Sequence, residues 1–223
     1  LLMNTGNTPI RSENGLLTSV GWRIGDDVTY VLEGSAFVAG AAVQWLRDGL
    51  KLIDSASAIE PLAMSVDDSE GVYFVPALTG LGTPYWNPDA RGLICGLTRG
   101  STAGHIARAT LEGIAYQNLD ILNAMASDAG HSLKGLKVDG GAAANNYLMQ
   151  FQADLLGVEI IRPKHLETTA LGAAFLAGLA VGIWESLDDV RATWLEDKRF
   201  ASAMPADEVQ RRIDGWHSAV KRA

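Results

Sequence analysis

The stretch that decides the fold is "VDGGAAANN", residues 138–146. The residues before it, "LKGLKVD", have the pattern of a strand, and "NNYLMQFQADLLG" after it has the pattern of a helix. The segments "VEIIRP" and "ETTALGAAFLAGLAVG" then repeat the same strand–helix order. This alternation is typical of α/β layers with parallel strands, so the sequence predicts an α/β fold.

The doubled glycine, Gly140 and Gly141, is expected at the carboxyl end of a strand, where α/β sheets bind their ligands. Glycine has no Cβ, so its backbone can adopt φ > 0 and approach a flat or anionic group closely. Asn145 could cap the next helix or donate to a ligand, and the helix N-terminus favours a negative group by about 0.3–1 kcal/mol. Two interpretations stay open, a simple turn or a ligand contact. The motif is neither GxGxxG nor GxxxxGK[ST].

The first half of the chain predicts three strands and then a helix. The strands are expected at residues 1–4, 15–24 and 28–32, and the helix at residues 36–52, with Ser35 as its N-cap. Further along, the sequence predicts a short strand at 71–78, one long helix at 101–130 and a terminal helix at 207–220 after an acidic linker. The Gly-, Pro- and aromatic-rich residues 79–92 are too long for a simple turn, and such loops are often functional or cover an interface.

Gly40 and Gln44 form the second candidate site. They are four residues apart on the expected helix and therefore share one face. A glycine inside a helix costs about 1 kcal/mol relative to alanine, so something is expected to approach closely there. Either a neighbouring helix packs against Gly40, or a ligand does.

Composition excludes several functional classes. The net charge is −8, and no Lys/Arg cluster suits nucleic acid. Cys95 is the only cysteine, which favours a cytoplasmic setting, and the four histidines are scattered, so no metal site is predicted. No apolar run reaches the ~18 residues of a membrane span. The nearest, residues 169–184, suits a tightly packed internal helix. The chain starts inside an apolar run, and we expect it to be part of a longer protein.

Several longer motifs resemble one family. "LMNTG", "SENGLLT", "LEGSAFVAGAAVQWLRD", "PALTGLGTPYWNPDARG" and "VDGGAAANNYLMQFQADLLG" are similar to the C-terminal half of bacterial glycerol kinases, which are FGGY carbohydrate kinases. Residues 92–112, from Gly92 through His105 to Glu112, resemble the second signature of that family. The resemblance covers nearly the whole chain. It implies an actin-like, ribonuclease-H-like ATPase domain, with residues 1–223 as the C-terminal nucleotide-binding domain.

The resemblance also implies a ligand and its contacts. Carried over to this sequence, the nucleotide-binding residues are Gly40, Gln44, Gly141 and Asn145. The implied cofactors are ATP or ADP, with Mg²⁺ bound mainly through the nucleotide phosphates. The catalytic aspartate and the polyol ligands of the family have no match in this chain, and Asp139 does not match the base. The chain alone is therefore expected not to phosphorylate glycerol, because phosphoryl transfer needs a closed, two-walled site.

Three functions remain open at this point. The chain is the nucleotide-binding half of a glycerol kinase, or of another FGGY kinase such as a pentulose kinase, since the substrate-selecting residues lie upstream. Alternatively it is a non-catalytic assembly module, with Tyr85 and Trp86 at an interface between copies. The expected partners are adenine nucleotide and, together with the N-terminal domain, glycerol. A homo-oligomer is expected for the full-length form.

Overall fold

The computed structural model describes all 223 residues. Its strands are β1 (Leu2–Gly6), β2 (Leu17–Ile24), β3 (Asp27–Glu33), β4 (Tyr73–Val75), β5 (Leu93–Cys95), β6 (Leu136–Lys137), β7 (Ile160–Pro163) and β8 (Glu196–Phe200). Its α-helices are α1 (Gly40–Asp48), α2 (Ile59–Ala63), α3 (Ala103–Ala129), α4 (Asn146–Leu156), α5 (Thr168–Ala180), α6 (Leu187–Ala192) and α7 (Ala206–Val220). Two 3₁₀ turns, η1 (Ala56–Ala58) and η2 (Gly141–Ala144), complete it.

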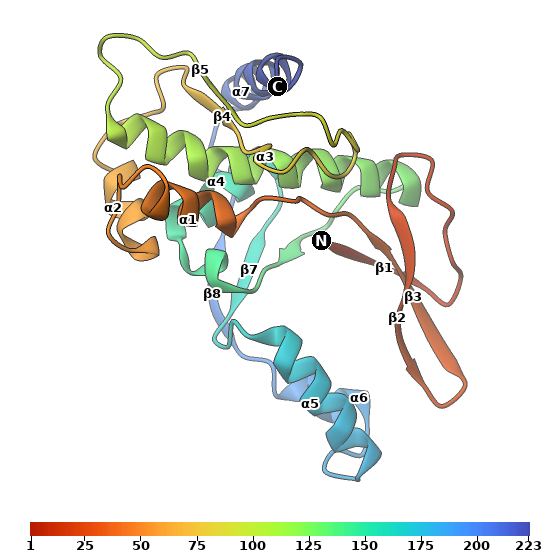
Figure 1. The fold of residues 1–223 in the computed structure, drawn as a ribbon. Coiled ribbons are helices and arrows are strands. Elements are labelled where there is room, and N and C mark those ends of the chain that lie inside the picture. Colours follow the sequence, from red (N-terminus) through yellow and green to blue (C-terminus); the bar gives the residue numbers. More distant parts are fainter.

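The three strands expected at the start of the chain are confirmed. They form an antiparallel sheet in the order β1-β3-β2, in which Glu33 is the partner of Leu2 on one side and Leu17 on the other. A tight turn that contains Gly25, with φ of +60°, joins β2 to β3. Figure 1 shows this sheet at one end of the molecule, beside the C-terminal end of α3.

The long central helix α3 is confirmed and organises the core. It begins with a capping box between Thr102 and His105 and ends at Gly130, which adopts the left-handed conformation that stops helices. The short antiparallel pair β4–β5 and helix α7 pack on one side of α3, and α1, α2 and α4 pack against it elsewhere (Figure 1). At the centre, the ring of Tyr116 stacks on that of Trp216, 5.2 Å apart.

The strand–helix alternation of the second half is also confirmed. β6 and β7 are parallel and are connected through α4, as the repeat of strand and helix predicts. The expected acidic linker before the terminal helix is wrong in part, because residues 196–200 form β8, which pairs antiparallel with β7. The strand alternates too little in hydrophobicity to be recognised, since four of its five residues are exposed.

The helix expected at residues 36–52 is shorter, and Ser35 does not cap it. α1 runs from Gly40 to Asp48 with Ala39 at its N-cap. The backbone of Ser35 is instead engaged with Thr83: its N–H donates to Thr83 Oγ1 at 3.2 Å, and its carbonyl accepts from the Thr83 N–H at 3.0 Å. These bonds hold the segment extended, so tertiary contacts prevail over the local capping signal.

The apolar helix α5 is not the packed internal helix that its composition predicts. Only Gly178 of its residues is buried, and α5 and α6 project from the body of the chain (Figure 1). A high content of alanine and glycine makes a helix small and apolar, but it does not determine which other elements the helix contacts. No helix of the structure is both long and apolar enough to cross a membrane.

Tyr85 and Trp86 each make a hydrogen bond within the chain, although they remain 37% and 43% exposed. The Tyr85 hydroxyl donates to Asp120 Oδ2 at 2.8 Å, and Trp86 Nε1 donates to the carbonyl of Gly15 at 2.6 Å. The ring of Trp86 also meets Phe37 edge-on, with 6.0 Å between ring centroids. These contacts order the loop at residues 79–92, and an interface between copies at Tyr85 and Trp86 stays a prediction.

Candidate functional site

A pocket of about 480 Å³ lies between α1, α2, α3 and the turn that leads into α4. Its volume falls in the range of small-molecule sites. It is lined by Gly40, Val43, Gln44 and Arg47 of α1; Ala56 and Ile59; Leu111 and Ile114 of α3; and Asp139, Gly140, Gly141, Ala142, Asn145 and Leu148. All four residues singled out from the sequence, Gly40, Gln44, Gly141 and Asn145, therefore lie around one pocket.

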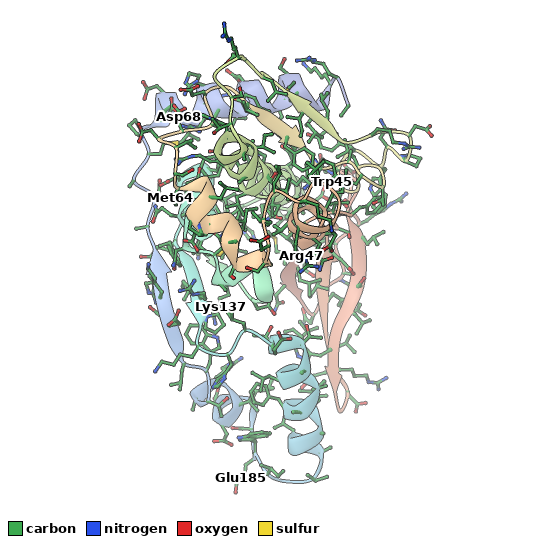
Figure 2. All side chains as sticks on the ribbon, turned by 60° about the vertical axis from the view of Figure 1, so that its left-hand side comes forward. Trp45, Arg47, Met64, Asp68, Lys137 and Glu185 are labelled. Atoms are coloured by element: carbon green, nitrogen blue, oxygen red, sulfur yellow. The ribbon has the colours of Figure 1, made fainter.

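Gly40, Gln44 and Arg47 of α1 line one side of this pocket, with Val43 at its floor. A Cβ built on Gly40 would meet no atom within 4 Å, so the interpretation that a neighbouring helix packs on Gly40 is wrong. Gln44, one turn later, is exposed. Figure 2 shows Trp45 and Arg47 on different sides of α1. Trp45 stacks on Phe74, whereas Arg47 lines the pocket.

Arg47 is held by its neighbour rather than left free. Its Nε and Nη2 each donate to the carboxylate of Asp48 at 2.8 Å. This hydrogen bonding raises the pKa of Arg47 and lowers the pKa of Asp48. The pocket rim therefore carries an oriented guanidinium whose charge is partly offset by the adjacent carboxylate. Arg47 lies one turn beyond Gln44, and extending the Gly40–Gln44 face by that turn would have identified it.

The doubled glycine forms the opposite wall. Gly140 has φ of +78°, the left-handed region that glycine tolerates, and a Cβ on Gly140 or on Gly141 would meet nothing within 4 Å. The turn is fixed from behind: the Gly140 N–H donates to the carbonyl of Leu166 at 2.8 Å. Arg162 of β7 donates through Nη1 to the carbonyls of Ala143 and Ala144, at 3.0 and 3.2 Å. The glycines therefore present bare backbone to the pocket from a held turn.

The N-terminus of α4 is satisfied by the protein itself. Asn145 caps it, since its Oδ1 accepts from the Leu148 N–H at 2.8 Å. Glu60 Oε1, from α2, accepts from the N–H groups of Asn146 and Tyr147, each at 3.1 Å. The expected preference of this helix end for a negative group is confirmed, but that group is the chain's own Glu60 carboxylate, which accepts from two of the free N–H donors. Asn145 keeps its Nδ2 group, which makes no hydrogen bond within the chain.

The floor of the pocket is apolar, and sequence reasoning missed its role. Five aliphatic side chains from four different segments form it, namely Val43, Ile59, Leu111, Ile114 and Leu148. Leu111 and Ile114 lie on α3, where helical periodicity alone does not distinguish a core position from a pocket floor. At the rim, the carboxylate of Asp139 accepts a hydrogen bond from Thr168 Oγ1. An apolar floor with polar groups at its edge suits a flat, partly apolar ligand.

No group of three or more His, Cys, Asp or Glu residues in the chain is arranged to hold a metal ion. The pocket itself offers one carboxylate, Asp139, which is hydrogen-bonded to Thr168. A divalent cation at this pocket would therefore have to take most of its oxygen ligands from water or from a bound ligand, as Mg²⁺ commonly does with phosphates.

Two antiparallel sheets and one mixed sheet, a central helix and a pocket beside a strand–glycine–helix turn make up a domain of the actin-like ATPase fold, which solved FGGY kinases share. Residues 1–181 match the family described as the FGGY family of carbohydrate kinases, C-terminal domain. The chain belongs to this family.

Curated relatives with similar sequences support the same assignment. The chain is 59% identical over 223 residues to a glycerol kinase of Burkholderia ambifaria and 60% identical to one of Burkholderia cenocepacia. It matches in full but spans about 45% of the length of these relatives. The crystal structure of Plasmodium falciparum glycerol kinase with ADP superposes with a TM-score of 0.90 at 40% identity, over 99% of this chain and 44% of that one. A ligand-bound xylulose kinase from Lactobacillus acidophilus, 22% identical, shares the fold with a TM-score of 0.79.

Proposed function

We propose that this chain is the nucleotide-binding half of an ATP-dependent glycerol kinase, which converts glycerol and ATP to glycerol 3-phosphate and ADP. The observation that carries the proposal is the shared pocket of Gly40, Gln44, Gly141 and Asn145. The glycerol kinase relatives at about 60% identity favour glycerol over a pentulose as substrate. The solved relative at 40% identity is a glycerol kinase with ADP, which favours adenine nucleotide as the ligand.

The residues of the pocket suit the parts of an adenosine. The aliphatic floor, which includes Ile59 and Leu111, would bury the faces of the purine. The free Nδ2 of Asn145 and the exposed amide of Gln44 would meet the polar edges of the nucleoside. Gly40, Gly140 and Gly141 leave the room that a Cβ would fill. Mg²⁺, when bound, would neutralise phosphate charge and would be held mainly by the phosphates themselves.

The complete reaction needs a second domain on the other side of the active site. In this proposal residues 1–223 form one domain, and a separate N-terminal domain supplies the polyol site and the catalytic base. Phosphoryl transfer depends on positioning and on charge stabilisation from both sides, so the isolated chain would bind nucleotide weakly and would not turn over glycerol. A cytoplasmic, homo-oligomeric full-length kinase is part of the same proposal.

Calorimetric titration with ADP and Mg²⁺ tests the proposed ligand. Loss of a good hydrogen bond typically costs about 0.5–1.5 kcal/mol, so Asn145→Ala and Gln44→Ala would each weaken binding about 2- to 12-fold. The matched control is Gln210→Ala, at an exposed amide of α7 that bonds only Asp214. Absence of ADP binding to the folded chain, or equal affinity in all three variants, would contradict the proposal. Turnover of glycerol and ATP by the chain alone would contradict the assignment of the base to another domain.

A further inference from the structure

Glu60 connects two walls of the pocket that are far apart in sequence. It lies on α2, directly after Ile59 of the pocket floor, and its Oε1 accepts from backbone N–H groups 86 and 87 residues further along the chain. Those donors, on Asn146 and Tyr147, belong to the first turn of α4, directly after Asn145. The carboxylate therefore joins the α2 side of the pocket to the α4 side.

This contact also fixes the direction of the Asn145 side chain. With the first two N–H groups of α4 bound to Glu60, the third, from Leu148, remains for Asn145 Oδ1 at 2.8 Å. The Met149 N–H bonds to the carbonyl of Asn145 at 3.2 Å. Because Oδ1 is committed to the helix, the amide cannot rotate freely, and Nδ2 is the atom left for a ligand.

The side chain of Tyr147 anchors the same turn to the core. Its hydroxyl donates to Oε1 of the buried Glu112 at 2.6 Å, and the guanidinium of Arg108 lies over its ring, 4.6 Å from the centroid. Burial raises the pKa of Glu112, the hydrogen-bond acceptor. The first turn of α4 is thus bound at Glu60 on the pocket side and at Glu112 inside the core.

We propose that Glu60 is a positioning residue of the nucleotide pocket: its carboxylate fixes the first turn of α4 so that Asn145 Nδ2 faces the ligand, and it closes that helix end to phosphate. The inference rests on the proposed nucleotide function and adds a residue to it. A helix N-terminus with free N–H groups is a natural phosphate site. Here those groups are taken and a negative charge stands before them, so the nucleoside end of the ligand, not its phosphates, meets α4.

Two variants separate the positioning effect from the charge. Glu60→Gln keeps an amide oxygen that can accept from both N–H groups but removes the charge. Glu60→Ala removes both. The control is Glu185→Ala, at the exposed tip between α5 and α6, far from the pocket (Figure 2). Each variant is titrated with adenosine, with ADP and with pyrophosphate, and its thermal unfolding is recorded.

If Glu60 acts by positioning the α4 turn, the affinity for adenosine should differ between the two Glu60 variants. Adenosine affinity should fall about fivefold in Glu60→Ala, because binding must then re-order the α4 turn, and should stay within about twofold of the unchanged chain in Glu60→Gln. Pyrophosphate should compete with adenosine in Glu60→Ala and not in the unchanged chain. Rescue by glutamine distinguishes positioning from a general loss of stability, which the melting curves report separately.

The possible results of these titrations test the role of Glu60 separately from the nucleotide pocket. If Glu60→Ala is folded and binds adenosine like the unchanged chain, or if pyrophosphate competes equally in both, the role of Glu60 is refuted while the nucleotide pocket stands. If Glu60→Gln is as weak as Glu60→Ala, the capping argument is refuted. If the unchanged chain binds neither ADP nor adenosine, the proposed function fails, and the inference fails with it.

Discussion

Oδ2 of Asp120, on α3, lies 2.7 Å from Nε1 of Trp216, on α7. The same oxygen accepts from the Tyr85 hydroxyl at 2.8 Å, and Oδ1 lies 3.0 Å from His217 Nε2. Asp120 and Trp216 are both buried. One carboxylate therefore ties the central helix to the loop at residues 79–92 and to the terminal helix.

Removal of this carboxylate should destabilise the fold more than an ordinary surface change. Asp120→Ala leaves the buried Trp216 N–H and the Tyr85 hydroxyl without partners, and we expect a loss of about 2–4 kcal/mol in the free energy of unfolding. Urea denaturation followed by tryptophan fluorescence measures it. The control is Asp67→Ala, since Asp67 is exposed. A change below about 0.5 kcal/mol in Asp120→Ala would show that the contacts of Asp120 contribute little.

Two helical glycines should respond oppositely to the same substitution. A Cβ on Gly113 of α3 would lie 2.3 Å from the carbonyl oxygen of Phe74 on β4, so Gly113→Ala should cost about 1–3 kcal/mol of stability. A Cβ on Gly40 would meet nothing, so Gly40→Ala should leave stability unchanged or raise it by up to about 1 kcal/mol. Chemical denaturation compares the two.

Gly40→Ala carries the more specific expectation for the proposed site. Its methyl group projects into the pocket, so ADP affinity should fall about tenfold although the fold is intact, in line with an overpacking cost of about 1–3 kcal/mol. Calorimetric titration of Gly40→Ala and of the unchanged chain measures this effect. An unchanged ADP affinity in Gly40→Ala would indicate that the nucleotide does not approach α1 at that residue.

Local sequence patterns were sufficient to predict much of the fold and part of the candidate site. Turn glycines and strand–helix alternation predicted β1 to β3, α3, α4 and β7, because these elements follow their own periodicity. Gly40 and Gln44 were identifiable together because four residues make one helical turn. Whether a neighbouring helix packs on Gly40 could be decided only from the space around its Cβ position, which is empty and which local sequence does not encode.

Other features depend on contacts that no local pattern encodes. Glu60 reaches the α4 turn from a short helix 86 residues earlier in the chain. Ser35 resembles an N-cap in sequence, yet Thr83 takes its backbone groups. The composition of α5 predicted burial, although only Gly178 is buried. In the first two cases the deciding partner is distant in sequence, and in the third the helix packs mainly on the nearby Trp184.

Glu208 gives a pH-dependent prediction. Its carboxylate accepts from Arg211 Nε at 2.7 Å and Nη2 at 2.6 Å, and from Arg212 Nε at 2.5 Å. The hydrogen bonds from Arg211 and then Arg212 lower the pKa of Glu208 from the ordinary 4.5 to about 2. Because the folded state favours the ionised form, its stabilisation is present above pH 4.5 and is lost as the pH falls through about 2.

Glu208→Gln should therefore lower the melting temperature at pH 7 by about 1–3 °C, a modest effect because the ion pairs are near the surface. The difference from the unchanged chain should narrow between pH 4.5 and pH 2. Differential scanning calorimetry across this range measures it, with Glu185→Gln as the control. A difference that stayed constant as the carboxylate became protonated would assign the effect to packing rather than charge.

The projection formed by α5 and α6 should open independently of the core. Its main internal contact is local: the ring of Phe175 meets Trp184 edge-on at 5.2 Å, and Gly178 lies under that indole. Val181 and Ile183 nearby are 75% and 69% exposed, so little apolar burial holds the segment. Amide hydrogen exchange should therefore be much faster at residues 168–192 than in the buried middle of α3.

Trp184→Ala should accelerate exchange in that segment further while the cooperative unfolding of the core changes by less than about 1 kcal/mol, because Trp184 lies outside the core clusters. Trp216→Ala, which removes an indole from the core, should instead lower global stability by about 3–5 kcal/mol. Exchange measured by mass spectrometry on both variants distinguishes local from global opening. Equal protection of α3 and α5 in the unchanged chain would mean that the projection unfolds only with the whole domain.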